Sequence, residues 1–233
     1  MIAINGTDQA PSIGTADYIG DDHLATSIDT PMKSDAFILE DDEKMQIIEE
    51  HFAQIMDTLG LDLTDDSLRG TPRRVAKMFV QEIFYGLDPS KKPRISLFDN
   101  KYQYSRMLVE RNITVKSYCE HHFQPILGRC HVGYISNGKV IGLSKINRLV
   151  DYYARRPQVQ ERLTRQILEG LQDALGTKDV IVVVDAIHQC VTNRGIQDQH
   201  SSTLTIDYSG RFEKNSVRQE FMELLKQDLN QKM

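Results

Sequence analysis

The sequence predicts an α+β fold in which an antiparallel sheet is packed by helices. Apolar residues recur at helical spacing in the first half of the chain and again between residues 144 and 175. Runs rich in β-branched residues occupy the stretches between these helices. The predicted order is helices, three strands, two helices, two strands and a helix, and consecutive strand runs favour antiparallel hairpins.

Two amphipathic helices are expected first. Apolar residues share one helical face from Met45 onward, and Gly60 can end that helix. A second helix is expected to begin with Thr71 as its N-cap and Pro72 as its first helical residue, and to end near Gly86.

Three strands should follow, starting at about Met107, at Ile126–Ile135 and at Lys139–Leu143. Residues 136–138, Ser-Asn-Gly, predict a hairpin turn between the last two. Ser144 is then expected to cap a helix.

The second half of the chain predicts a helix, two strands and a final helix. The helix is expected over about 158–175, with Gly176 at its end. The valine-rich run 179–187 predicts a buried strand, and the alternating run 202–208 a half-exposed strand. An amphipathic pattern over 216–229 predicts the last helix.

The 233 residues divide into three expected regions. Residues 1–38 are rich in small and polar residues without periodicity, which predicts a flexible N-terminal arm. We expect an N-terminal helical region over residues 39–105 and a strand-bearing domain over residues 106–233.

Composition excludes several classes of protein. No stretch of about 18 apolar residues predicts a membrane helix. The N-terminus lacks the basic start and apolar segment of a secretory signal, and three cysteines do not suggest a disulfide framework. A net charge of −5 argues against a general nucleic-acid binder. We expect a cytoplasmic protein that binds neither nucleic acid nor membrane.

Residues 119–122, Cys-Glu-His-His, are the first candidate for chemistry. A turn can direct Cys119 and His122 at one point, and zinc accepts both thiolate and imidazole. Two ligands make half a site, so this spacing alone is a weak signal.

His188 and Cys190 end the buried valine-rich strand and could complete such a site. Three protein ligands and one open position are typical of catalytic zinc, whereas structural zinc has four protein ligands. The alternative is that Cys190 is a buried core thiol, which is common for free cysteines.

Basic side chains in three segments of the chain are candidates for binding phosphate. Lys145 and Arg148 share a helical face, as do Arg74 and Lys77, and Arg194 closely follows Cys190. Arginine and lysine suit phosphate oxygens, although each side chain taken singly is better explained as a solvated surface charge. Glu161, near a helix start, is likewise explained by the helix dipole alone.

Taken together, these segments resemble the GTP cyclohydrolase I family over about residues 45–229. The resemblance rests on five strings in this order: Arg-Gly-Thr-Pro-Arg-Arg-Val-Ala-Lys-Met at 69–78, Cys-Glu-His-His-Phe at 119–123, Gly-Leu-Ser-Lys-Ile-Asn-Arg at 142–148, Arg-Pro-Gln-Val-Gln-Glu-Arg-Leu-Thr at 156–164, and His-Gln-Cys-Val at 188–191 with Arg-Gly at 194–195.

The resemblance implies a role for each matching residue. Zinc would be held by Cys119, His122 and Cys190, and the acid/base histidines would be His121 and His188. Guanine would be bound by Gln160 and Glu161. The triphosphate would be bound by Lys145, Arg148 and Arg194, together with Arg74 and Lys77 from a neighbouring subunit. Ser144 and Glu120 would lie in the nucleotide pocket.

The reaction implied is the conversion of GTP and water to 7,8-dihydroneopterin 3′-triphosphate and formate, the first step of folate or tetrahydrobiopterin biosynthesis. Zinc would activate water for attack on C8 of guanine, while His188 acts near N7 and His121 at the ribose ring oxygen. The family's tunnelling fold implies a toroidal homodecamer with active sites at subunit interfaces.

One local departure and two alternatives accompany this resemblance. Between Cys190 and Arg194 the chain reads Val-Thr-Asn, where many relatives carry a basic residue or methionines. We expect this departure to leave the reaction intact and to bear only on fine details of phosphate contact. Another tunnelling-fold enzyme, such as a pterin synthase or a deazaguanine reductase, is one alternative, although no dinucleotide fingerprint is present. A zinc-stabilised nucleotide-binding scaffold is the other, and it would leave His121 and His188 without a role.

Overall fold

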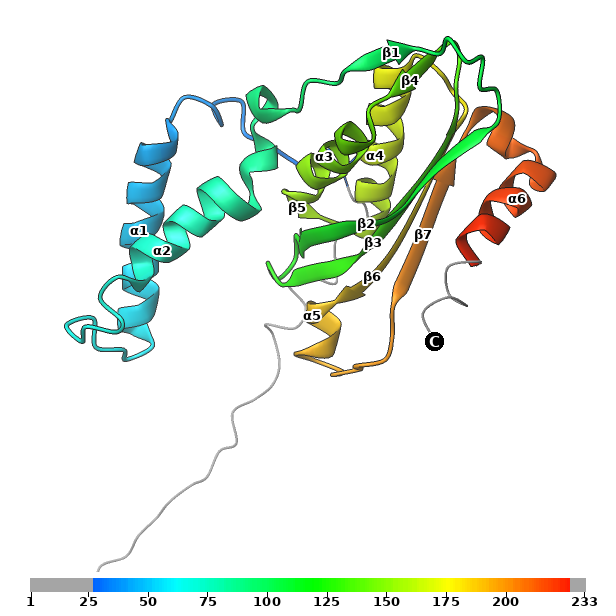
Figure 1. Ribbon diagram of the computed structural model, residues 1–233. Coiled ribbons are helices and arrows are strands. Elements are labelled where there is room, and N and C mark those ends of the chain that lie inside the picture. Colours follow the sequence, from blue (N-terminus) through cyan, green and yellow to red (C-terminus); the bar gives the residue numbers. More distant parts are fainter. Residues whose placement is uncertain (1–26, 227–233) are drawn as a thin grey trace, which may run out of the picture.

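The computed structural model describes residues 27–226, which form a curved sheet flanked by helices, with a helical pair standing to one side (Figure 1). This arrangement confirms the expected mixed α and β class. The expected arm lies mostly within residues 1–26, outside the described residues.

The main sheet has the order β5-β2-β3-β6-β7. Its long strands β2 (Met107–Cys119), β3 (Pro125–Ile135) and β6 (Val180–His188) are antiparallel neighbours, and β7 (Thr203–Tyr208) pairs antiparallel with β6. The two-residue strand β5 (Pro157–Gln158) lies parallel to the end of β2. The ends of β2 and β6 therefore lie on either side of the start of β3.

Helices α3 (Leu143–Ala154) and α4 (Gln160–Leu175) cover one face of the sheet (Figure 1). Even-numbered β6 residues such as Val182 pack in the core beneath them, because side chains alternate along a strand. Gly176 ends α4 in the left-handed conformation with φ +64°, as the sequence predicts.

Helix α6 (Asn215–Lys226) covers the opposite face together with the 3₁₀ turn Gly210–Glu213. Phe212 and Phe221 are fully buried there against the odd-numbered β6 residues. The expected helix over 216–229 is confirmed as far as the described residues extend.

The helical pair consists of α1 (Asp41–Thr58) and α2 (Thr71–Lys77), which contact each other beside the sheet (Figure 1). After α2 the chain continues in wider π-helical turns over Met78–Ile83 and in 3₁₀ turns over Tyr85–Leu87 and Pro89–Lys91. The single second helix expected up to Gly86 is therefore wrong beyond Lys77.

Gly86 and Tyr85 attach this helical pair to α3. A Cβ atom at Gly86 would lie 2.1 Å from the Tyr152 carbonyl oxygen, so only glycine permits this approach. The Tyr85 hydroxyl donates to Asp151 at 2.5 Å. Burial and this carboxylate raise the pKa of Tyr85 to about 12.

The expected hairpin at residues 136–138 is wrong. Strand β4 (Lys139–Ile141) pairs with β1 (Leu97–Asp99), a strand that the sequence analysis missed, in a separate two-stranded sheet. Both edges of β3 are already paired, one with β2 and the other with β6. These longer strands form more residue pairs with β3 than the three residues of β4 could.

Three helix starts also differ from expectation. Gly70, not Thr71, is the N-cap of α2, and Gly142, not Ser144, is the N-cap of α3. In both cases the glycine carbonyl accepts the first helical hydrogen bond, so the hydroxyl side chain lies inside the first turn. Helix α4 starts at Gln160, because the two residues before Val159 pair with β2 as β5.

No helix within residues 27–226 is long and apolar enough to cross a membrane.

Candidate active site

The fold brings Cys119, His122 and Cys190 together although 68 residues separate the last two. One ligand atom from each lies within 4.8 Å of the others. Cys119 ends β2, His122 lies in the turn to β3, and Cys190 lies in the short helix α5 (Gln189–Thr192) after β6. The register of β3 with both strands accounts for this meeting.

Hydrogen bonds within the turn fix the position of Cys119. Its backbone N–H donates to the Gln124 carbonyl at 2.8 Å, and its own carbonyl accepts from Phe123 N–H at 2.8 Å. Phe123 adopts φ +52°, an uncommon value for a side chain of this size. The loop from Cys119 to Phe123, here called the CEHHF loop, is therefore a closed turn.

Two thiols and an imidazole suit zinc chemically. Burial and the adjacent Cys119 thiol raise the pKa of Cys190 to about 11. A bound cation reverses this, because metal binding releases the thiol protons and stabilises the thiolates. Three ligands and no fourth in the described cluster match the pattern of catalytic zinc sites.

His121 lies between a thiol and a carboxylate. Its Nδ1 atom is 3.6 Å from Cys119 Sγ, and its Nε2 atom is 3.9 Å from a Glu120 carboxylate oxygen. The ring is exposed, so it is accessible to a ligand bound at the cluster.

His188 is held by the buried side chain of Gln160. Gln160 Oε1 lies 2.8 Å from His188 Nε2. Its amide nitrogen donates to the carbonyls of Val184 and Thr203, at 3.0 and 2.7 Å. Gln160 is 1% exposed, and both ends of its amide have partners within the chain.

Glu161 is the exposed neighbour of Gln160 at the start of α4. Burial lowers the pKa of His188 below its ordinary value, and the negative charge of Glu161 opposes this shift. Glu161 therefore lies near enough to His188 for their charges to interact. Among the described residues, no hydrogen bond or ion pair occupies its carboxylate.

Arg194 reaches the cluster from the segment after α5. Its Nη1 atom lies 2.8 Å from His122 Nε2. The exposed guanidinium is thus placed beside one of the three candidate zinc ligands.

The other basic residues are not brought to this cluster by contacts within the described chain. Lys145 and Arg148 lie near the start of α3, which directly follows β4 at the Ile135 end of the sheet. Cys119 lies at the other end, since Met107 pairs with Ile135 and Tyr118 with Pro125. Ser144 is exposed beside Lys145.

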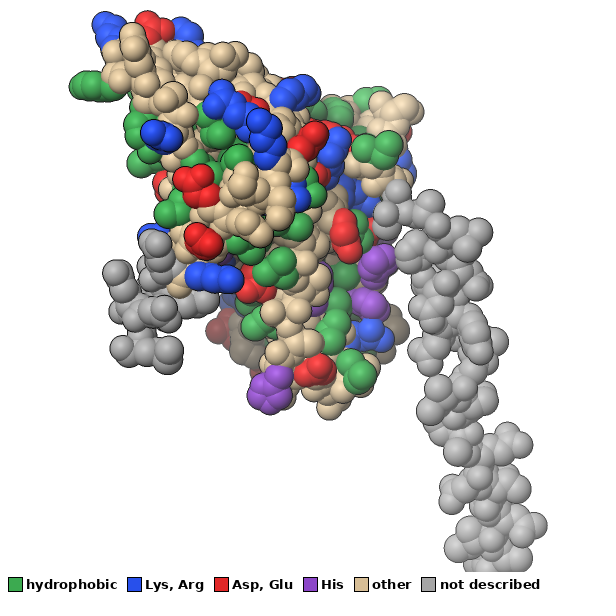
Figure 2. Space-filling model, turned by 90° about the vertical axis from the view of Figure 1, so that its right-hand side faces the viewer, with side chains coloured by type: hydrophobic (Ala, Val, Ile, Leu, Met, Phe, Trp, Pro, Cys, Tyr) green, Lys and Arg blue, Asp and Glu red, His purple; other side chains and the backbone are tan. Residues whose placement is uncertain are grey.

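On α2, Arg74 and Lys77 are both exposed. The Arg74 guanidinium donates to the Ser67 carbonyl and to Thr71 Oγ1, at 3.2 Å each. Positive and negative side chains are interspersed on the face shown in Figure 2, so that face has no continuous basic surface.

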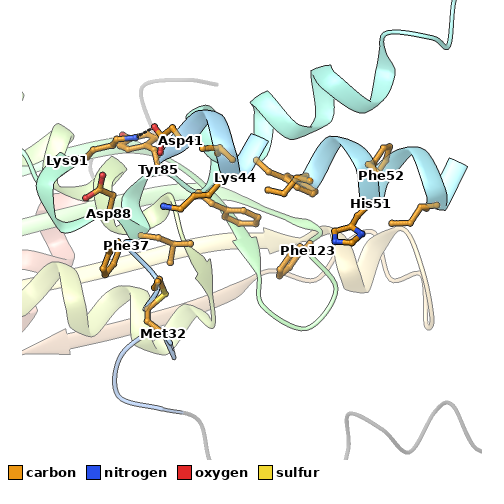
Figure 3. A pocket seen from close by; sticks show the side chains of 17 residues that line it. Met32, Phe37, Asp41, Lys44, His51, Phe52, Tyr85, Asp88, Lys91 and Phe123 are labelled. Carbon is orange, nitrogen blue, oxygen red and sulfur yellow. Dashed lines mark hydrogen bonds and ion pairs between the residues drawn. The ribbon is translucent and has the colours of Figure 1, made fainter. Parts of the chain in front are cut away.

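A cavity of about 460 Å³ lies between the helical pair and the CEHHF loop (Figure 3). Its lining includes Phe37, His51 and Phe52 from the N-terminal region and Phe123 from the loop. It does not include the cysteine–histidine cluster, so the cluster and this apolar cavity are distinct features.

A sequence model described as GTP cyclohydrolase I matches residues 48–226. The chain belongs to the GTP cyclohydrolase I family. A GTP cyclohydrolase 1 of Flavobacterium johnsoniae is 57% identical over 212 residues, covering 91% of this chain and 95% of the relative. Relatives of the same name from Aeromonas salmonicida and Erwinia tasmaniensis are 52% and 49% identical, covering 87% and 85% of this chain and 92% and 90% of their own.

Sequence reasoning missed the buried side chain of Arg162 in this family member. Its guanidinium holds both carboxylate oxygens of Glu120, at 2.7 and 3.2 Å. Glu120 was expected to contact the nucleotide, yet its carboxylate already has this partner. An arginine beside the apolar positions of an amphipathic helix is the signal that could have indicated such a buried pair.

Proposed function

We propose that this chain is a zinc-dependent GTP cyclohydrolase I that converts GTP and water to 7,8-dihydroneopterin 3′-triphosphate and formate. This reaction begins folate or tetrahydrobiopterin biosynthesis. The observation that carries the proposal is the grouping of Cys119, His122 and Cys190, with His121 against Cys119 and with His188 two residues before Cys190. The family membership supports GTP as the substrate.

Zinc at Cys119, His122 and Cys190 would supply water activated for attack near neutral pH. A ring nitrogen that binds a cation cannot also accept a hydrogen bond. If zinc binds His122 through Nε2, Arg194 is released from that atom and becomes available to the substrate's phosphates.

The histidines would move the protons that the chemistry requires. We assign His188 to N7 of guanine, where a proton makes C8 more electrophilic, and His121 to the ribose ring oxygen as the sugar opens. Both assignments use the ordinary suitability of imidazole for proton transfer near neutrality.

We assign recognition of guanine to Glu161. An ionised carboxylate accepts hydrogen bonds only, and guanine offers N1–H and a 2-amino group side by side. Gln160 was expected to share this task. Because both ends of its amide bond within the chain, we assign it instead to holding His188.

Binding of the triphosphate is assigned to basic side chains from more than one copy of the chain. Arg194 lies at the cluster of its own chain. Lys145, Arg148 and Ser144, near the far end of the sheet, would come from a neighbouring copy, as would Arg74 and Lys77. This sharing agrees with a tunnelling fold assembled as a toroidal homodecamer. Within each copy we assign residues 1–38 to an arm, residues 39–105 to the helical region and residues 106–233 to the catalytic domain.

Release of formate from GTP tests the proposed function. The zinc-loaded protein should release formate and yield a pterin that fluoresces after oxidation, and Cys119→Ala should yield neither. Formate from neither protein would contradict the proposal and favour a scaffold. Nicotinamide-dependent reduction of a deazaguanine by the same preparation would favour the reductase alternative.

A further inference from the structure

The most deeply buried ionic pair in the described chain joins the CEHHF loop to α4. The side chain of Arg162 is 3% exposed and that of Glu120 is 20% exposed. Two N–H···O bonds of 2.7 and 3.2 Å connect them, one to each carboxylate oxygen. Bidentate pairs of this kind fix orientation as well as supplying energy.

Arg162 is itself fixed by a third hydrogen bond. Its Nε atom donates to the Ser27 carbonyl at 2.9 Å. The guanidinium is therefore held on both edges, by the chain before α1 and by the CEHHF loop. An arginine with this set of partners has little freedom to rotate, so Glu120 is held by a fixed fork.

Glu120 transmits this constraint to the candidate reacting groups. It follows Cys119 and precedes His121 in the chain, and its backbone N–H donates to the Gln158 carbonyl at 3.0 Å. Its carboxylate lies 3.9 Å from His121 Nε2. Movement of the Glu120 side chain would therefore displace the histidine beside it.

We propose that Arg162 is a positioning residue of the active site, which acts through Glu120 to hold the CEHHF loop and His121 in the geometry that turnover requires. This inference rests on the proposed function. It removes Glu120 from the residues that contact the nucleotide, because its two oxygens serve Arg162. It also predicts effects on turnover that exceed effects on GTP binding.

Substitution of Arg162 tests the role of the guanidinium fork. Arg162→Met keeps the length and apolar stem of the side chain but removes the fork. We expect kcat for formate release to fall by about 10-fold or more, as for residues that support metal ligands. The KM for GTP should change by less than about 3-fold, since no contact with the nucleotide is lost. Arg162→Lys should recover only part of kcat, because a lysine keeps the charge without the fork.

Arg165→Met is the matched control. Arg165 lies one turn further along α4 and also forms ion pairs, with Glu169 and Asp207, but its side chain is 55% exposed. This variant should keep wild-type kcat. Equal kcat in Arg162→Met and wild type, with wild type active, would overturn the positioning role while leaving the proposed function intact. An inactive wild type would contradict the proposed function itself.

A double substitution separates positioning from independent effects. If Arg162 acts through Glu120, Arg162→Met with Glu120→Gln should lower kcat no further than Arg162→Met alone. Multiplied losses would contradict the proposal.

A second readout does not depend on activity. Cobalt in place of zinc reports ligand geometry by visible absorption, and the spectrum should shift in Arg162→Met but not in Arg165→Met. An unchanged spectrum together with unchanged kcat would show that the pair only stabilises the fold.

Discussion

The amide of Gln160 connects His188 to two neighbouring strands. One end lies 2.8 Å from the imidazole, and the other donates to the carbonyls of Val184 on β6 and Thr203 on β7. Two rigid backbone positions therefore set the orientation of one candidate acid/base group. Both ends of the Gln160 amide therefore have hydrogen-bond partners within the chain before any substrate binds.

Gln160→Leu should therefore lower kcat by about 10–100-fold with little change in the KM for GTP, because it frees His188 without removing a contact to the nucleotide. It should also lower the free energy of unfolding by about 1–3 kcal/mol, since it leaves a buried carbonyl unpaired. Steady-state kinetics and urea unfolding measure these effects. Gln172→Leu is the control, because Gln172 lies on the same helix but its amide bonds to Ser209, which follows β7. A raised KM with unchanged kcat would return Gln160 to guanine binding.

Glu161→Gln should lower kcat/KM for GTP by orders of magnitude while the protein stays folded. One glutamine nitrogen would face a guanine donor, and sites built to bind such groups reject mismatched partners by about 10⁴–10⁵. Circular dichroism and formate release are the measurements. Glu169→Gln, on the same helix and bonded to Arg165, should keep normal activity. Near-normal use of GTP by Glu161→Gln would leave only a helix-dipole role, worth about 0.3–1 kcal/mol.

Cys119→Ala should lose bound zinc and formate release together, whereas Cys130→Ala should keep both. Cys130 is fully buried in the core, away from the cluster, and burial raises the pKa of its thiol well above its usual range. Its replacement should lower the free energy of unfolding by about 0.5–1.5 kcal/mol, as for other single-atom deletions in a core. Metal analysis after dialysis measures zinc content. Zinc retained at wild-type occupancy by Cys119→Ala would contradict the ligand assignment.

Mixed oligomers should show that active sites are shared between copies. Lys145→Ala and His188→Ala should each be inactive alone, because each lacks a component of every site. Dissociated and reassembled together, they should regain part of the activity, since some sites combine an intact Lys145 with an intact His188. Light scattering should show a large homo-oligomer. Absence of any recovery in correctly assembled mixtures would place Lys145 outside a shared site.

Tyr85→Phe should make stability less sensitive to alkaline pH. The folded pKa of Tyr85, about 12, exceeds the ordinary value of 10.0. Its contribution to folding is therefore complete below pH 10 and decreases as pH rises from 10 towards 12. The Tm of the wild type should fall more steeply across this window than that of the variant. Parallel decreases in Tm would show that the hydroxyl does not link the helical pair to α3 through Asp151.

The sequence by itself determined the class of fold and most of its long elements, and the family resemblance named the three candidate zinc ligands. Local rules suffice for the elements, because a 3.6-residue period defines α4 and a valine run defines β6, whereas the Cys-Glu-His-His string alone is a weak metal signal. Gly176 was likewise predictable, since a left-handed helix end favours glycine.

Only the tertiary structure decided which groups meet. Strand pairing depends on competition between distant segments, which is why β4 pairs with β1 and why two residues after α3 become β5. The same pairing places Cys190 beside Cys119. Burial decided the hydrogen-bond partners of Gln160 and Arg162, because a polar side chain in a low-dielectric interior must bond to whatever the fold places beside it. No local pattern in the sequence records that Arg162 is that neighbour for Glu120.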